Sequence, residues 1–194
     1  MSYFEAAYRK VEFETIEKPS DDSNWSKRKF GNRIVSNIEE AQDLVDTFVI
    51  HDPGILQYPS RISAQRALEI TIDELTLPNK KKSAHWTLGE DGTLYKHLSI
   101  LYMGWHAGNS ELFGDKWMNN RSCGIEVIGP PFSDIQYYVL AELINRMRNV
   151  FPKITPQRII GHYHISSYRG KIDPRSFNWE YLFQLMYASR TNLY

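Results

Sequence analysis

The chain is poor in several features that mark particular classes of protein. Its single cysteine, Cys123, excludes an intramolecular disulfide and is compatible with a reducing compartment. Lysine plus arginine and aspartate plus glutamate both number 23, so the basic excess of a nucleic-acid binder is missing. We therefore expect no nucleic-acid partner, and a solvated loop at the basic run 80–82. No apolar run approaches the length of a membrane span, which predicts no membrane insertion.

The N-terminal residues also lack the charged start and the apolar core of a signal peptide. We therefore expect synthesis in the cytoplasm without export by the standard route.

A length of 194 residues is typical of one domain with a sizeable core. Residues 1–35 are predicted to form an N-terminal arm, because residues 18–24 are turn-rich and polar. Residues 36–194 then make up the domain, for which we favour a monomer. Some aromatic side chains of the arm are expected to pack on the domain: Tyr3, Phe4, Tyr8, Phe13 and Trp25.

Apolar periodicity, turn residues and two capping boxes, Ser36 with Glu39 and Ser133 with Gln136, predict alternating helices and strands along the domain. The predicted helices cover 36–45, 63–75, 133–151 and 178–188, and the predicted strands cover 47–50, 84–88, 93–98, 122–129 and 158–161. Residues 84–98 read as an antiparallel hairpin, whereas the other strands are separated by helices. The sequence therefore predicts an α/β fold, a single domain with a central mixed sheet flanked by helices on both faces.

Three widely separated segments each supply one residue of a type that binds metal ions. His51 and His162 directly follow apolar strand segments, and Asp173 precedes Pro174. Two imidazoles and a carboxylate form the ligand set of a hydrolytic zinc site that keeps a fourth position open for water. Neither histidine belongs to a His-Glu-x-x-His helix, which excludes the common metalloprotease arrangement. The pattern favours an enzyme with its zinc site at the strand ends.

The order of six short motifs resembles the zinc-dependent N-acetylmuramoyl-L-alanine amidase family. That family includes AmpD-type recycling amidases, phage endolysins and peptidoglycan recognition proteins. The resemblance covers about residues 45–185 and rests on Val49-Ile50-His51, Ser83-Ala84-His85-Trp86 with Asp91-Gly92-Thr93, Trp105-His106-Ala107-Gly108, Ser122-Cys123-Gly124-Ile125-Glu126, Gly161-His162, and Lys171-Ile172-Asp173-Pro174.

The resemblance implies hydrolysis of the amide between the lactyl group of N-acetylmuramic acid and L-alanine. It implies that His51, His162 and Asp173 bind Zn²⁺. The alternatives are two core histidines and an ordinary Asp-Pro turn. Glu126 is a lone carboxylate in an apolar strand, which suits a general base with a raised pKa. A salt bridge is the alternative for this residue.

Further residues are candidates for catalysis or substrate binding. Lys171 lies two positions before Asp173, so in an extended segment both side chains point the same way, and a cation there would stabilise an oxyanion. Its alternative is a surface lysine. Trp105 and His106 are predicted to line the substrate groove. Other predicted substrate contacts are Asn109, Arg121 and His85, where His85 has a packing role as its alternative.

Some other positions have no expected role in catalysis, and three positions depart from the family pattern. We expect His97 to be solvated and Cys123 to be a small buried residue. His164 replaces the usual Asp, Gly170 lengthens the segment between His162 and Asp173 by one residue, and Arg175 stands where Gly is common. These departures affect the loop expected to grip the peptide stem.

Four functions remain compatible with the sequence. A phage-type endolysin acting on peptidoglycan is preferred slightly, because the arm and the altered loop are unlike the recycling type. A cytosolic AmpD-like amidase acting on anhydro-muropeptides is the alternative. A non-catalytic peptidoglycan-binding module is disfavoured by the intact ligand set, and a zinc hydrolase of another amide is the last candidate.

Overall fold

A computed structural model describes residues 15–55 and 62–191 of the chain. Its main element is a six-stranded mixed sheet in the order β1-β7-β6-β11-β5-β12. These strands are β1 (Thr15–Glu17), β5 (Thr47–His51), β6 (Trp86–Leu88), β7 (Leu94–Lys96), β11 (Ser122–Val127) and β12 (Ile159–Gly161). Strands β6, β11, β5 and β12 run parallel to one another, and β7 is antiparallel to β6. The predicted mixed sheet is confirmed.

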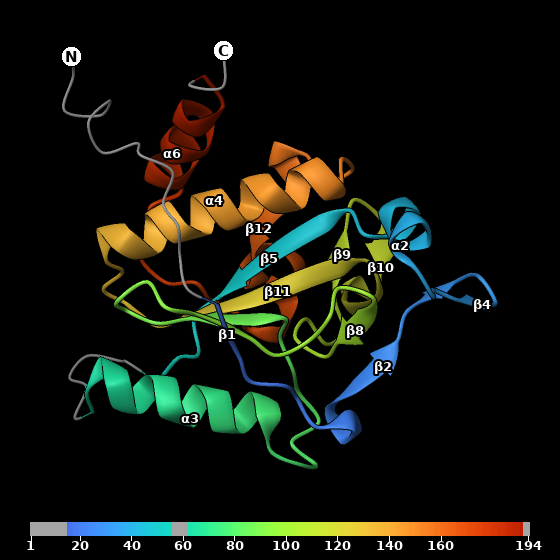
Figure 1. Cartoon of the computed structure of the whole chain (residues 1–194), viewed down its shortest axis with the longest axis horizontal. Helices are drawn as coiled ribbons and strands as arrows, with labels where there is room; N and C mark the ends of the chain where they lie inside the picture. The colour runs from blue at the N-terminus through green and yellow to red at the C-terminus, as the bar shows by residue number, and fades with distance from the viewer. Residues whose placement is uncertain (1–14, 56–61, 192–194) are drawn as a thin grey trace.

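Helices cover both faces of this sheet, as Figure 1 shows for α4 on one side and α3 on the other. The α-helices are α2 (Ile38–Leu44), α3 (Ala64–Thr76), α4 (Asp134–Val150), α5 (His162–Ser166) and α6 (Trp179–Thr191). Ser63 caps α3, and the predicted capping box of Ser133 and Gln136 opens α4. The N-cap of α2 is Asn37 and not the predicted Ser36, because the Asn37 side chain accepts the Glu40 backbone N–H.

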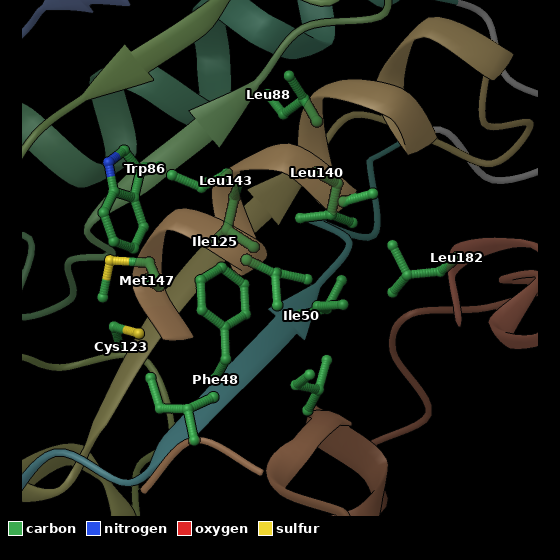
Figure 2. Close-up of a cluster of buried hydrophobic side chains, with 14 of the residues drawn as sticks. Phe48, Ile50, Trp86, Leu88, Cys123, Ile125, Leu140, Leu143, Met147 and Leu182 are labelled. Atoms are coloured by element: carbon green, nitrogen blue, oxygen red, sulfur yellow. The ribbon is translucent and has the colours of Figure 1, made fainter. Parts of the chain in front are cut away.

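The hydrophobic core lies between the sheet and α4. Phe48 and Ile50 of β5 and Ile125 of β11 point toward Leu140 and Leu143 of α4 (Figure 2). All five residues of β5 are buried, as expected for a central strand with helices on both faces. Cys123 is fully buried in the same cluster, which agrees with its predicted role as a small core residue.

Successive side chains of a strand point to opposite faces, so the residues between these core positions face α3 and α5. On that face Val49 packs with Ile160 and Ile165 in a smaller cluster. Glu126 of β11 is the register partner of His51 of β5. Both side chains therefore lie side by side at the carboxyl ends of neighbouring parallel strands, on the face away from α4.

Smaller elements complete the described residues. They are β2 (Trp25–Lys27), β3 (Lys29–Phe30), β4 (Arg33–Ile34), β8 (Tyr102–Gly104), β9 (Glu111–Leu112) and β10 (Asp115–Lys116), with 3-10 helices at Asp22–Asn24, Met118–Asn120, Pro156–Arg158 and Ser167–Arg169. Within the described ranges, no helix combines the length and the apolar character needed to cross a membrane.

Residues 15–35 of the predicted arm are integrated into the body. Strand β1 pairs in parallel with β7, and β2 pairs with β8. Trp25 stacks on Tyr102 with 4.1 Å between ring centroids. The other aromatic residues expected to pack from the arm fall in residues 1–14, outside the described residues.

The side chain of Arg28 connects the N-terminal segment to the rest of the domain. Its side chain is fully buried, and it donates to the backbone carbonyls of Ile100, Asn119, Asn120 and Ser122 at 2.6–3.1 Å. Burial lowers the pKa of Arg28 to about 10, so the guanidinium stays charged at neutral pH.

His97 is buried, and the prediction that it is solvated is wrong. Its Nδ1–H donates to the Lys18 carbonyl at 2.7 Å, and its Nε2 lies 2.9 Å from the Thr87 hydroxyl. The N-terminal segment covers it, which the local sequence around His97 does not reveal.

Candidate active site

The three predicted metal ligands meet at one end of the sheet. His51 ends β5, His162 follows β12 and opens α5, and Asp173 lies in the loop after α5. Because β5 and β12 are neighbouring parallel strands, the two histidines lie close together. The Nδ1 atoms of His51 and His162 lie 3.2 and 3.1 Å from Asp173 Oδ2. One ligand atom from each residue falls within a group no wider than 4.8 Å.

The donor atoms fit a zinc ion. His162 Nε2 lies 3.3 Å from the Ala107 carbonyl, which can only accept, so Nε2 carries the ring proton and Nδ1 presents a lone pair. Burial lowers the pKa of His51 and favours its neutral form. Neutral imidazoles and an ionised carboxylate are the forms that bind Zn²⁺.

Glu126 stands beside this cluster in a chemically demanding position. Its residue is partly buried, yet Oε2 is sealed from solvent and has no hydrogen-bond partner. Burial, followed by the negative charges of Asp173 and Asp52, raises the pKa of Glu126 to about 8. The salt bridge considered as an alternative for Glu126 is not among the ion pairs of the described residues. A carboxyl group that is sealed, unpaired and raised in pKa exchanges its proton near neutral pH, as a general acid or base must.

A cleft of about 560 Å³ opens over these groups, within the range of small-molecule sites. Glu126 and the three predicted metal ligands line it, together with Lys171, Trp105 and His106. The opposite wall comes from α3 and the segment after it, through Ile70, Thr71, Glu74, Leu75, Lys81 and Lys82. The positive charge of Lys171 acts on the carboxyl group of Glu126. The cleft therefore brings together the predicted metal ligands, a carboxyl group and a cation.

Three predicted substrate contacts lie elsewhere. Arg121 precedes β11 and pairs with Asp46, which precedes β5, so it sits at the opposite end of the parallel strands from His51. His85 is fully buried, and its Nδ1 accepts the Gly124 backbone N–H at 3.1 Å, which is a packing role. Asn109 is exposed and is not among the residues that line the cleft.

The structure adds site residues that the sequence reasoning missed. Asp52 follows His51 and forms an ion pair with Arg175, which also donates its backbone N–H to Asp52 Oδ2 at 2.8 Å. This pair ties the loop of Asp173 to the end of β5. Arg169 lines the cleft and donates to the carbonyls of Ala107 and Asn109, each at 3.1 Å. The available signal was that Asp52 directly follows His51 and that Arg175 lies two residues after Asp173.

Two further expectations concern the basic run 80–82 and the replacement at His164, both near the cleft. Lys80 and Lys82 of the basic run pair with Glu74 of α3, and Lys81 and Lys82 line the cleft. His164 lies in α5, where its Nδ1 accepts the Gly161 backbone N–H at 3.0 Å. An Asp side chain can also accept such a bond at a helix start, so this replacement preserves a cap.

Comparisons with known proteins agree with this site. The family model described as N-acetylmuramoyl-L-alanine amidase matches residues 41–176. The 1,6-anhydro-N-acetylmuramyl-L-alanine amidase AmpD of Haemophilus influenzae is 41% identical over 102 residues, which cover 50% of this chain and 55% of that protein. The same enzyme of Escherichia coli is 33% identical over 101 residues, covering 50% and 54%. The chain spans about half the length of these curated relatives.

Solved structures extend the likeness over most of the chain. A selenomethionine derivative of AmpD superposes with a TM-score of 0.63 at 25% identity, covering 88% of this chain and 93% of the other. A mutant endolysin from Bacillus subtilis gives a TM-score of 0.62 at 18% identity, covering 90% and 99%, which shows a shared fold. Because the family model matches residues 41–176, well over half of the chain, this chain belongs to the N-acetylmuramoyl-L-alanine amidase family.

Proposed function

We propose that this protein is a zinc-dependent amidase that hydrolyses the bond between N-acetylmuramic acid and L-alanine in soluble anhydro-muropeptides. One observation carries the proposal. His51, His162 and Asp173 converge at the ends of β5 and β12, with the unpaired Glu126 on the neighbouring strand in the same cleft. Family membership supports the choice of amide.

Each residue of the cleft has a place in the reaction. Zinc, when bound by His51, His162 and Asp173, supplies a Lewis acid that activates water at neutral pH and polarises the amide carbonyl. Glu126 takes a proton from the attacking water and returns it to the leaving amine of L-alanine. Lys171 stabilises the negative charge that develops on the amide oxygen. The indole of Trp105 offers an apolar wall for the sugar ring.

The choice of a soluble substrate revises the slight preference for a phage-type enzyme. The curated relatives are named as 1,6-anhydro-N-acetylmuramyl-L-alanine amidases, which supports the recycling alternative. The endolysin neighbour supports only the fold. The altered residue His164 caps a helix, so it does not argue for a different substrate. We expect a recycling enzyme to meet its substrate in the cytoplasm.

The test is to digest two substrates in parallel, a soluble anhydro-muropeptide and intact sacculi, and to identify the products by mass spectrometry. Each digestion is run with the zinc-loaded protein, with a chelator, and with zinc restored. We expect chelator-sensitive release of peptides that begin with free L-alanine, faster from the soluble substrate. The variant Glu126→Gln is the matched control, because it keeps the metal ligands and lacks the base.

Other outcomes identify the competing functions. Faster release from sacculi would establish the endolysin alternative. Binding of muropeptides without zinc and without release would indicate a binding module. Products cut at another amide, with no free lactyl group, would indicate a different hydrolase.

A further inference from the structure

We propose that His106, which lines the cleft, is a positioning residue for the metal centre and does not act by contact with substrate. It holds the imidazole of His51 with its proton on Nε2, so that Nδ1 presents a lone pair to the metal. The inference rests on the metal site of the proposed function, and it concerns a side chain that contacts a metal ligand and orients it without binding the metal itself. It follows from a series of hydrogen bonds that connects the Met118 carbonyl through Ser122 and His106 to the metal ligand His51.

The first side chain in this series is Ser122, the first residue of β11. Its hydroxyl donates to the Met118 carbonyl at 2.5 Å, which uses its only hydrogen. The same oxygen lies 3.3 Å from His106 Nε2, so toward this ring Ser122 can only accept. The proton of His106 must therefore lie on Nε2. A neutral His106 then has a lone pair on Nδ1.

The second step connects His106 to the metal ligand. His106 Nδ1 lies 3.1 Å from His51 Nε2. A second proton on His106 Nδ1 would oppose the proton of His51 Nε2 at that distance, so the pair is favourable only when His51 donates and His106 accepts. The proton of His51 is thereby fixed on Nε2, and His51 Nδ1 is left bare, 3.2 Å from Asp173 Oδ2.

The position of the His106 ring is built into the sheet. A Cβ atom on Gly124 would come within 2.5 Å of His106 Nδ1, so only glycine at this point of β11 leaves room for the ring. The rings of His51 and His85 contact His106 edge-on, with centroids 5.2 and 5.9 Å away. Asn119 Oδ1 accepts the backbone N–H of His106 at 3.1 Å. These contacts leave the ring little freedom to turn away from His51.

Ala107, the residue after His106, orients His162 in the way that His106 orients His51. The Ala107 carbonyl accepts the Nε2–H of His162 and leaves its Nδ1 bare. His106 and Ala107 therefore set both imidazoles in the same protonation pattern, with both lone pairs turned toward Asp173. Loss of a partner that orients a ligating histidine typically weakens metal binding by about 10- to 100-fold.

The competing role for His106 is contact with substrate, since it lines the cleft. The two roles are separated by a pair of variants. In His106→Asn the amide oxygen can occupy the place of Nδ1 and accept from His51, whereas His106→Leu has similar volume and no acceptor. Zinc affinity is measured by competition with a chromophoric chelator, and folding is checked by circular dichroism.

We expect the Leu variant to bind zinc about 10- to 100-fold more weakly than the wild type and the Asn variant to recover most of that loss. Unchanged zinc affinity in the Leu variant, with a raised KM, would overturn the proposal in favour of substrate contact. Equal losses in the Asn and Leu variants would also overturn it, because the acceptor would then be irrelevant.

A measurement on the unmodified, metal-free protein tests the same point without a variant. The ¹⁵N chemical shifts of the histidine rings distinguish protonated from bare nitrogens, and we expect His51 and His106 to carry their protons on Nε2. A bare Nε2 on His51 would refute the hydrogen-bond chain. A wild-type protein with the expected shifts but no zinc affinity would instead refute the proposed function.

Discussion

Replacing Glu126 by Gln should stabilise the metal-free protein at alkaline pH while it removes catalysis. Glu126 is sealed at Oε2, lacks a partner there, and faces the negative charges of Asp173 and Asp52. Ionisation of this carboxyl group in the folded protein is therefore costly. Gln keeps the shape of the side chain and carries no charge at any pH, so the variant avoids that cost.

The magnitude follows from the difference between the folded and unfolded pKa values of Glu126. The folded value is about 8 and the unfolded reference is 4.5. The native state thus holds a proton between these values that the unfolded chain has released, so native stability falls as the pH rises through this window and levels off above pH 8. A shift of this size corresponds to about 5 kcal/mol, an upper limit because water in the cleft screens the charge.

The assay is urea unfolding of the metal-free proteins at pH 4.5 and pH 8.5. We expect Glu126→Gln to match the wild type at the lower pH and to exceed it by about 2–5 kcal/mol at the higher pH. The exposed Glu111 on β9 provides the control, and Glu111→Gln should show no such pH-dependent gain. With zinc bound, turnover of Glu126→Gln should fall by about 10²-fold or more.

Two results would refute this reasoning separately. Equal stability of Glu126→Gln and wild type at pH 8.5 would mean that Glu126 is not penalised by its surroundings. Wild-type turnover in the variant would mean that Glu126 is not the base, whatever its effect on stability.

Three further predictions test the metal ligand and the N-terminal segment. Asp173→Ala should lose zinc and turnover together, and zinc retained at the wild-type level in elemental analysis would exclude Asp173 as a ligand. Burial lowers the pKa of His97 to about 4 from 6.5, so stability should be lost as the pH falls through this range, by about 3 kcal/mol from this residue. His97→Gln should show a shallower acid loss in urea unfolding, and an unchanged slope would contradict the assignment. Arg28→Met should cost at least about 3 kcal/mol, because it strands several buried carbonyls, and a loss under 1 kcal/mol would show that these carbonyls find other partners.

The sequence predicted those parts of the site that depend on local pattern. His51 and His162 directly follow short apolar strands, and such strands become the central members of a sheet covered on both faces. Once β5 and β12 are parallel neighbours, their carboxyl ends coincide and the two histidines meet. Glu126 could be found because a carboxylate in an apolar strand conflicts with its surroundings.

Residues that depend on contacts between distant segments were not predictable. Arg28 reads as a surface residue, since nothing near it in sequence indicates the four carbonyls that surround it. His97 is buried by β1, whose pairing with β7 joins segments about 80 residues apart. Arg121 was predicted as a substrate contact, but it pairs with Asp46 at the opposite end of the strands from the cleft, and a sequence motif does not show which end of its strand faces the cleft.

The two faces of β5 and β11 have different surroundings: one face packs into the hydrophobic core, and the other contributes side chains to the cleft. Phe48, Ile50 and Ile125 point toward α4 and belong to the large apolar core, whereas His51 and Glu126 point the other way into the cleft. Strands alternate their faces at every residue, so each of these two cleft side chains is one residue away from a core side chain that fixes its position. This arrangement lets the cleft hold an unpaired carboxyl group and two bare imidazole nitrogens, because the core on the opposite face opposes their outward movement. A cation bound at His51, His162 and Asp173 would relieve the remaining repulsion, so zinc should raise the free energy of unfolding of wild type more than that of Glu126→Gln.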